Sequence, residues 1–200
     1  MVERVKIALF ENLANVLTSC RLIAASWLIV SALNNGQVVL MFVLAAFCVA
    51  SDFFDGKVAR YCGIESWLGS FLDRLADKIF VVPITIALIL HYWPNEASLN
   101  MQILTAELAM VVILLELFLI VSVLYCLKTG VYLSANRWGK LKMGFESGVI
   151  LVWLLSVVVE ERLGFLVWQW SIALIDFGLA SAVLFAVMSI QGYFQHWRSA

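Results

Sequence analysis

The sequence predicts an all-α integral membrane protein: a six-transmembrane-helix bundle with an N-terminal amphipathic interfacial helix. Of the 200 residues, 64% are hydrophobic and only 14% are charged, whereas a soluble domain is usually close to half apolar. The apolar residues also gather in runs of about the 20 residues that a helix needs to cross a bilayer. We therefore expect residues 1–200 to form a single membrane domain.

The predicted elements follow one another along the chain with polar breaks between them. The first segment, MVERVKIALFENLANV, mixes charged and apolar residues and predicts the interfacial helix. The apolar runs that predict transmembrane helices cover residues 13–33, 38–60, 67–90, 102–126, 142–160 and 168–194. The breaks are NNGQ (34–37), YCGIES (61–66), HYWPNEASLN (91–100), KTGVYLSANRWGK (128–140) and EERLG (160–164). Their Asn, Gly and Pro residues favour turns.

Lysines and arginines are distributed unevenly between the two predicted sides of the bundle. An even number of spans places both termini on one side. That side holds all of the 13 lysines and arginines except Arg162. Because positively charged segments stay in the cytoplasm, we expect both termini and residues 57–78 to be cytoplasmic. The net charge of −1 argues against a nucleic-acid-binding protein, which usually has a basic excess.

Four aspartates lie near the predicted cytoplasmic ends of the second and third spans. A helix turns about 100° per residue, so residues three or four positions apart share a face. The second-span face would contain Asp52, Asp55, Gly56, Ala59 and Arg60, and the third-span face Gly69, Asp73 and Asp77. Because the loop between these spans is short, the helices are antiparallel neighbours, and both acidic faces can point at each other.

Four carboxylates in one cleft of low dielectric constant repel each other unless some are protonated or a cation neutralises them. Oxygen ligands favour Mg²⁺, Mn²⁺ or Ca²⁺ over zinc, and neither His91 nor His196 is near the aspartates in sequence. Two divalent ions bridged by carboxylates suit phosphoryl transfer, because they stabilise the attacking and the leaving oxygen.

The alternative is that these aspartates only form salt bridges at the water interface. Their partners would be Lys57, Arg60, Arg74 and Lys78. Small residues on the same faces favour the functional interpretation, because they leave room for a ligand or a closely packed helix. Arg60 is suited to binding a phosphate with two hydrogen bonds.

The spacing of these residues resembles the motif of the CDP-alcohol phosphatidyltransferases, D-x2-D-G-x2-A-R-x8-G-x3-D-x3-D. All eight fixed positions are present, as Asp52, Asp55, Gly56, Ala59, Arg60, Gly69, Asp73 and Asp77. NLANVLTSCR at 12–21 also resembles the opening of the family's first span. The resemblance implies transfer of a phosphatidyl group from CDP-diacylglycerol to an acceptor hydroxyl with release of CMP. It further implies a homodimer among membrane lipids and, for a bacterial member, a location in the inner membrane.

The resemblance also assigns a role to each motif residue. Asp52, Asp55, Asp73 and Asp77 would bind two Mg²⁺ or Mn²⁺ ions. Asp73 and Asp77 would be catalytic, with Asp77 in the position of the family's usual general base. Gly56, Ala59, Arg60 and Gly69 would contact the cytidine diphosphate.

Residues 136–146, NRWGKLKMGFE, bear on the identity of the acceptor. GKLK resembles an element of bacterial phosphatidylglycerophosphate synthases, as does GSFLDRLADK at 69–78. Arg137, Lys140 and Lys142 would form a cationic cluster that suits a phosphorylated acceptor such as glycerol 3-phosphate. Alternatively, the lysines anchor lipid head groups.

Two departures from that subgroup keep other acceptors open. Arg74 stands where the subgroup has proline, and LLELF at 114–118 keeps Glu116 without the preceding arginine. The alternative acceptors are phosphatidylglycerol, giving cardiolipin, an inositol phosphate, and serine.

Glu107, Glu116 and Asp176 are further acidic residues inside the predicted spans. We expect Glu107 and Glu116 to support the bundle interior, with the outer interface as an alternative for Glu107, and Asp176 to have a partner in the bundle. A membrane transporter with an acidic ion site is the alternative class of protein, and it would spread acids through the membrane or pair them between repeated halves. The aspartates cluster at one end of two adjacent spans instead, which favours the enzyme.

Overall fold

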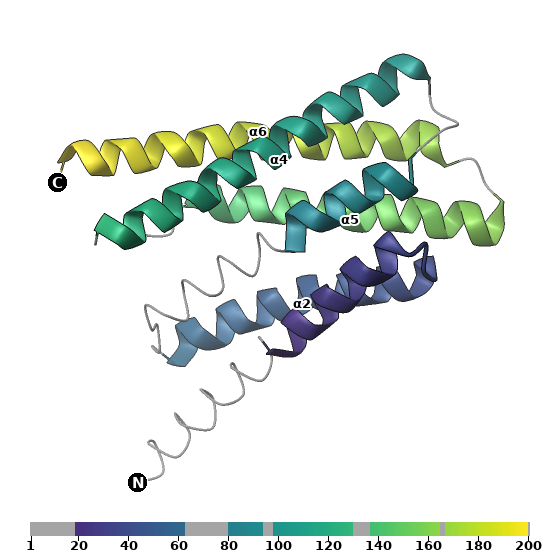
Figure 1. The fold of residues 1–200 in the computed structure, drawn as a ribbon, viewed down its shortest axis with the longest axis horizontal. Helices are drawn as coiled ribbons and strands as arrows, with labels where there is room; N and C mark the ends of the chain where they lie inside the picture. Colours follow the sequence, from purple (N-terminus) through teal and green to yellow (C-terminus); the bar gives the residue numbers. More distant parts are fainter. Residues whose placement is uncertain (1–18, 63–79, 94–97, 130–136, 165–166, 200) are drawn as a thin grey trace, which may run out of the picture. The chain divides into compact units, whose positions relative to one another are not determined.

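The computed structural model describes residues 19–62, 80–93, 98–129, 137–164 and 167–199, and all regular structure within them is helical (Figure 1). The labelled helices are α2 (Val38–Cys62), α4 (Leu99–Thr129), α5 (Arg137–Leu163) and α6 (Trp168–Ser199). Two shorter apolar helices cover Ser19–Leu33 and Phe80–His91. The six helices of the described residues confirm the predicted all-α class.

The chain divides into two compact units, Met1–Ile84 and Thr85–Ala200. In the first unit, a tight turn joins the helix Ser19–Leu33 to α2. Asn35 adopts the left-handed conformation, with φ of 50°, and the N–H of Gly36 donates to the carbonyl oxygen of Ser31 at 2.8 Å. A Cβ atom on Gly36 would come within 2.9 Å of that oxygen, so only glycine fits here. The break predicted at 34–37 is therefore confirmed.

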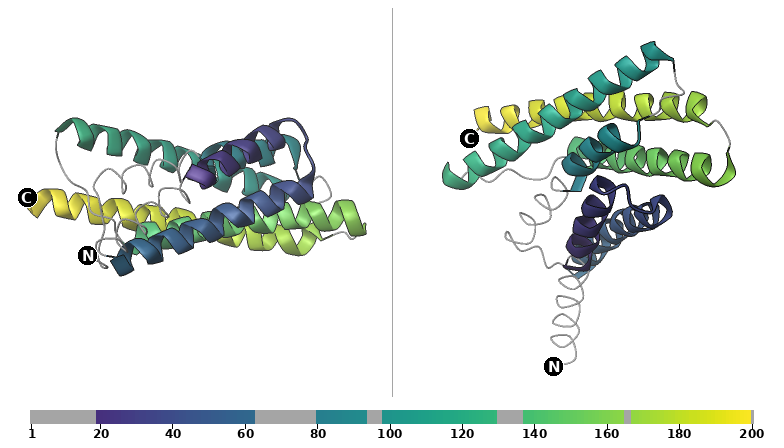
Figure 2. Two further views of the ribbon diagram at one scale, coloured as in Figure 1. Left: turned by 90° about the horizontal axis from the view of Figure 1, so that it is seen from below. Right: turned by 45° about the vertical axis from the view of Figure 1, so that its right-hand side comes forward.

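In the second unit, α6 packs along both α5 and α4 (Figures 1 and 2). α5 and α6 run antiparallel. α5 ends at Leu163, and the left-handed φ of 64° at the following Gly164 allows its N–H to donate to the carbonyl oxygen of Glu160 at 3.0 Å. The two helices approach closely at Gly178, where an added Cβ would lie 2.4 Å from Cγ2 of Val149. In the parts of α4 and α5 that the structure describes, the two backbones make no comparably close approach.

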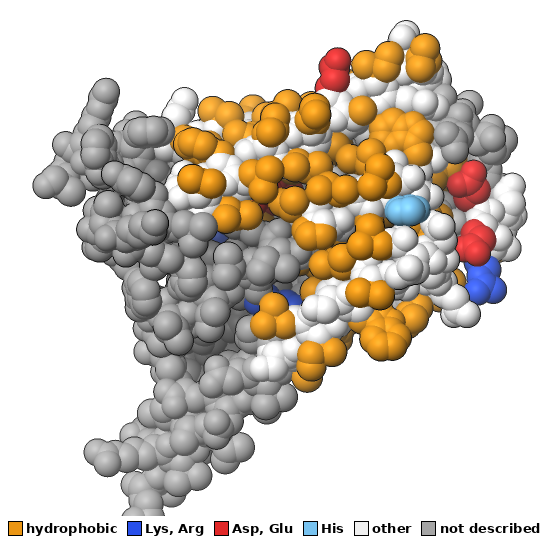
Figure 3. All heavy atoms as spheres, viewed as in Figure 1, with side chains coloured by type: hydrophobic (Ala, Val, Ile, Leu, Met, Phe, Trp, Pro, Cys, Tyr) orange, Lys and Arg blue, Asp and Glu red, His pale blue; other side chains and the backbone are white. Residues whose placement is uncertain are grey.

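Among the described residues, three helical stretches are long and apolar enough to cross a membrane: Leu99–Ser122, Arg137–Leu163 and Trp170–Gln191. Their outer surfaces are also apolar. Met110 and Val121 of α4 are each 64% exposed, and apolar side chains cover most of the described surface in Figure 3. So large an apolar surface marks contact with lipid or with another apolar partner, and the chain is an integral membrane protein.

Two finer predictions about the membrane arrangement are not tested by these helices. The predicted interfacial helix lies outside the described residues, as do residues 67–79 of the predicted third span. The first, second and third predicted spans are represented by the shorter apolar stretches Ser19–Leu33, Val38–Ser51 and Phe80–His91. Six membrane crossings therefore remain a prediction.

The long helices extend beyond the apolar runs that predict them. α4 has 31 residues and α5 has 27, so Lys128 and the stretch 137–140 are helical, and the loop predicted at 128–140 was wrong at both ends. The break predicted at 160–164 also begins too early, because α5 continues to Leu163. A run of apolar residues marks the part of a helix within the hydrocarbon, whereas backbone hydrogen bonding continues through its polar ends.

Candidate functional site

The first half of the aspartate motif lies on α2. This helix is continuous from Val38 to Cys62, so positions 52, 55, 56, 59 and 60 occupy successive turns of one helix, as predicted. The side chains of these residues lie outside the described part of the structure, as do Gly69, Asp73 and Asp77 entirely. The convergence of the two acidic faces therefore stays a prediction.

The residues of the motif fit a hard divalent cation by their chemistry. Carboxylate oxygens are the ligands that Mg²⁺ and Mn²⁺ prefer, and the helical backbone places Asp52 and Asp55 three residues apart, on one side of α2. Among the side chains that the structure describes, no group of three or more His, Cys, Asp and Glu residues could hold a metal ion. The described side chains thus offer no competing metal site.

The turn of α2 that precedes Asp52 packs against the helix Ser19–Leu33. The thiol of Cys48 contacts the carbonyl oxygen of Arg21 at 3.8 Å, and the hydroxyl of Ser51 donates to the carbonyl oxygen of Cys48 at 2.9 Å. Arg21 and Ser51 are only 5% and 4% exposed. The arginine of the NLANVLTSCR segment is therefore buried against the same helix that carries Asp52 and Asp55.

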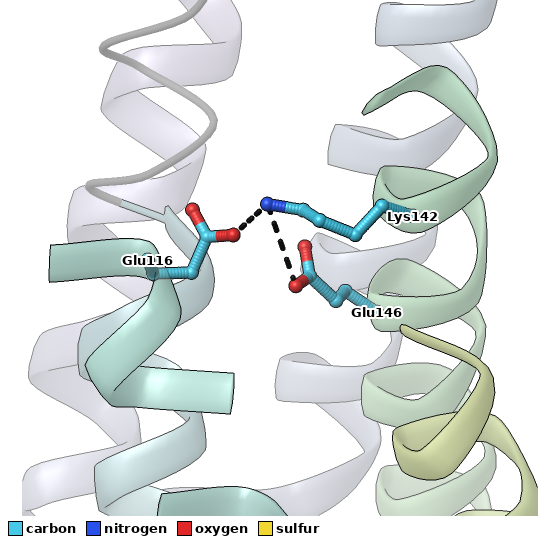
Figure 4. A network of polar contacts seen from close by, with 3 residues as sticks. All are labelled: Glu116, Lys142 and Glu146. Atoms are coloured by element: carbon cyan, nitrogen blue, oxygen red, sulfur yellow. Dashed lines mark ion pairs between the residues drawn. The ribbon is translucent and has the colours of Figure 1, made fainter. Parts of the chain in front are cut away.

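A second charged group is buried in the other unit, between α4 and α5 (Figure 4). Lys142 of α5 forms an ion pair with Oε1 of Glu116 on α4, and its Nζ lies 3.6 Å from Oε1 of Glu146, one turn further along α5. The exposed fractions of Lys142, Glu116 and Glu146 are 3%, 1% and 3%. Burying a charge is costly unless it is paired, so each of these side chains depends on the others. We refer to these three residues as the Lys142 network.

The structure separates the three cations that were predicted to form one cluster. Arg137 and Lys140 are exposed in the first turn of α5, whereas Lys142 is buried. Lys140 and Lys142 are two residues apart, so a helix places them about 200° from each other around its axis. The role predicted for the three cations in binding the acceptor phosphate remains a prediction, but they do not lie together on one exposed face.

The structure describes three other acids of the predicted spans. Glu116 is in the interior, as expected, whereas Glu107 is exposed and does not support the interior of this chain. Asp176 of α6 accepts a hydrogen bond of 2.6 Å from the hydroxyl of the fully buried Thr105 on α4, which confirms the predicted partner. Sequence reasoning missed Glu146, although its i, i+4 spacing from Lys142 was a readable signal.

Comparison with known proteins identifies the class to which this chain belongs. Residues 11–190 match the CDP-alcohol phosphatidyltransferase family. The chain belongs to the CDP-alcohol phosphatidyltransferase family, so the enzyme family predicted from the motif at 52–77 is confirmed. Members of this family generally depend on divalent metal ions and use a CDP-linked donor and an alcohol acceptor.

Several similar proteins have related names. A probable phosphatidylglycerophosphate synthase of Mycobacterium tuberculosis is 30% identical over 160 residues, which cover 75% of this chain and 69% of that protein. A CDP-diacylglycerol–glycerol-3-phosphate 3-phosphatidyltransferase of Salmonella choleraesuis is 24% identical over 94% of each chain. A protein of Rickettsia bellii with the same name is 37% identical over 81 residues, and this match spans 45% of its length.

Proposed function

We propose that this chain transfers a phosphatidyl group from CDP-diacylglycerol to glycerol 3-phosphate and releases CMP. The observation that carries the proposal is the complete eight-position motif at residues 52–77, inside a family match over residues 11–190. The names of the Mycobacterium, Salmonella and Rickettsia relatives support glycerol 3-phosphate as the acceptor.

The motif residues would bind the donor in two ways, through metal ions and through direct contacts with the nucleotide. Asp52, Asp55, Asp73 and Asp77 would hold two divalent ions, Mg²⁺ or Mn²⁺. Such ions, when bound, neutralise the diphosphate and stabilise CMP as a leaving group. Gly56, Ala59, Arg60 and Gly69 would contact the cytidine diphosphate. Among these four residues, Arg60 would bind phosphate oxygens. Gly56, Ala59 and Gly69 have small side chains, which would let the nucleotide come close to the backbone.

The chemical step needs one proton acceptor from the chain. The acceptor hydroxyl attacks the phosphorus atom that carries the diacylglycerol, a new P–O bond forms, and the bond from that phosphorus to CMP breaks. Asp77 would take the proton of the hydroxyl, and Asp73 would be the other catalytic residue. The phosphate of the acceptor would be bound by the exposed Arg137 and Lys140, because cations recognise phosphate through charge-assisted hydrogen bonds. Lys142, which is buried on another side of α5, would join them only after its ion pairs rearrange.

The membrane arrangement belongs to the same proposal. Residues 1–200 form one domain of six membrane spans preceded by an interfacial helix, in a bacterial inner membrane. The distribution of basic residues supports an active site and both termini on the cytoplasmic side. There, the lipid-tailed donor arrives laterally and the acceptor arrives from water. The active enzyme is a homodimer surrounded by membrane lipids.

A panel of acceptors tests the proposal. Purified full-length chain in mixed micelles receives CDP-diacylglycerol, Mg²⁺ or Mn²⁺, and either glycerol 3-phosphate, phosphatidylglycerol, an inositol phosphate or serine. We expect CMP and phosphatidylglycerophosphate to form with glycerol 3-phosphate and far less product with the other acceptors. Faster turnover with another acceptor would replace the substrate, and release of CMP with none of them would overturn the proposed activity.

A further inference from the structure

We infer that the outward face of α4 forms the contact between two copies of this chain, and that Glu107 binds Glu107 of the partner subunit there. The inference rests on the proposed function in one respect, because a homodimer is part of that proposal. It follows from the position of Glu107, whose carboxylate is exposed within an apolar stretch long enough to cross the membrane.

Buried and exposed residues form two separate stripes along α4. The buried stripe advances by four and three residues in turn: Thr105, Ala109, Val112, Glu116 and Leu119. The exposed stripe has the same alternation: Ile103, Glu107, Met110, Leu114, Leu117 and Val121. Thr105 and Glu107 are two positions apart, so a helix separates the two stripes by about 200° around its axis. Because the buried stripe packs within this chain, the exposed stripe faces away from it.

Glu107 is the charged residue of the exposed stripe. It follows Leu99, the first residue of α4, by eight positions, and therefore lies about 12 Å along the helix from its start. Among the residues that the structure describes, none forms an ion pair or a hydrogen bond with Glu107. A carboxylate that faces hydrocarbon is costly, and acids within membrane spans almost always face protein or a water-filled cavity. The position of Glu107 therefore indicates that another protein chain covers this face.

A second copy of the chain fits this face by symmetry. Apolar residues that alternate by three and four positions are typical of helices that pack side by side, and one polar residue among them fixes the register. Two copies have the same orientation in the membrane, so their two-fold axis runs along the membrane normal. Each residue of the exposed stripe then meets its counterpart at the same depth. Two facing Glu107 carboxyl groups bind each other when they share one proton, because the protonated group donates to the ionised one.

Cysteine cross-linking of the full-length chain in membranes tests where the two copies touch. Met110→Cys places a thiol in the exposed stripe, and Leu174→Cys places one on α6; the native residues are 64% and 60% exposed. A disulfide requires Cα atoms within about 7 Å of each other. We therefore expect oxidation to give a covalent dimer with Met110→Cys, and with Leu174→Cys no more dimer than the wild-type cysteines give. Equal yields from the two variants, no dimer with Met110→Cys, or a product that contains a different protein would overturn the inference.

Two substitutions test the role of the Glu107 carboxyl group in the dimer. A glutamine side chain can donate and accept a hydrogen bond, whereas a leucine side chain can do neither. A hydrogen bond between membrane helices changes association by about threefold to thirtyfold. We expect Glu107→Leu to raise the dissociation constant of the dimer in liposomes by about that factor, and Glu107→Gln to change it by less than about threefold.

Glu161→Leu is the matched control, because it removes an exposed carboxylate at the end of α5, and it should leave the dissociation constant unchanged. The inference is overturned if Glu107→Leu dimerises as tightly as the wild type, or if Glu107→Gln weakens the dimer as much as Glu107→Leu does. None of these measurements uses the reaction. Failure of the interface and failure of the proposed activity are therefore separate results.

Discussion

The aspartates of residues 52–77 and the glutamates of the Lys142 network are both groups of acids in an apolar chain. They differ in the source of the positive charge that compensates them. Each glutamate of the network is held by an ammonium group of the protein. The aspartates are spaced as a repeated set on two spans that the sequence predicts to be neighbours, and we propose that metal ions compensate their charge. The role of an acid inside a membrane protein therefore depends on the positive charge that is paired with it.

This difference predicts that removing a charge has different consequences in the two regions. In the aspartate motif the loss should appear in catalysis while the fold persists, because the partner is an exchangeable ion. In the Lys142 network the loss should appear in stability and in acceptor binding, because the partner is another part of the fold. The following variants test that contrast.

The largest effect is expected from Asp73→Asn and Asp77→Asn. An amide cannot accept the proton of the acceptor hydroxyl and is a poor ligand for two metal ions. Removing a general base typically lowers the rate by about a hundredfold to ten-thousandfold, so we expect kcat for CMP release to fall by at least that factor. Glu107→Gln, at an exposed site, should retain full activity.

Thermal unfolding in detergent provides the control for these variants. Both aspartate variants should unfold within a few degrees of the wild type, because they remove a functional charge and leave packing intact. Full activity in either variant would remove that aspartate from the proposed site. A large loss of stability would mean that the motif is structural, like the Lys142 network.

Lys142→Met tests the structural side of the comparison. Removing one partner of a buried ion pair commonly costs about 3–5 kcal/mol, and here the change leaves two buried carboxylates without their shared ammonium group. We expect a loss of that size in the free energy of unfolding, measured by denaturant or thermal unfolding in detergent. Lys140→Met, at an exposed position of the same helix, should change it by less than about 0.5 kcal/mol. Equal stability of the two variants would contradict the structural role of the network.

The sequence predicts well those features that depend on neighbouring residues. The turn at 34–37 could be predicted because Asn and Gly favour turns, and Asn35 does adopt the left-handed conformation there. The motif could be predicted because its eight positions lie within one short segment. The helical backbone of α2 through Cys62 agrees with the prediction that the first part of the motif lies on one helix.

Features that depend on distant residues were not predictable in the same way. Nothing local to Glu116 indicates that it meets Lys142 from another helix, since the pairing is made by the packing of α4, α5 and α6. The ends of α4 and α5 were also misjudged, because polar residues such as Lys128 and Arg137 end an apolar run without ending a helix. Hydropathy reports the solvent around a residue, and helix ends depend on backbone hydrogen bonds.

Gly178→Ala tests the packing that brings the Lys142 network together. The new Cβ would lie 2.4 Å from Cγ2 of Val149, and forcing a methyl group into a packed interface costs about 1–3 kcal/mol. We expect a loss of that order in the free energy of unfolding. Gly148→Ala is the matched control, because nothing lies within 4 Å of its added Cβ, and it should be neutral or gain up to about 1 kcal/mol from helix propensity. The reverse order would show that α5 and α6 do not pack as described.

The smallest effect is expected from Lys140→Met on acceptor binding. An exposed charge contributes about 0.2–1 kcal/mol, so the KM for glycerol 3-phosphate should rise by about 1.4- to fivefold while the KM for CDP-diacylglycerol stays the same. A proportional rise in both KM values would favour anchoring of lipid head groups over recognition of the acceptor. Salt should weaken the effect further, because the side chain is exposed.

The claim on which the account depends is that divalent ions, held by the aspartates of residues 52–77, enable transfer from CDP-diacylglycerol. It is tested most directly by CMP release from the purified chain with glycerol 3-phosphate before chelation, after chelation with EDTA, and after Mg²⁺ or Mn²⁺ is restored. The account predicts release, its loss on chelation, and its recovery with either ion. Undiminished release in EDTA, or none under any of these conditions, would contradict it.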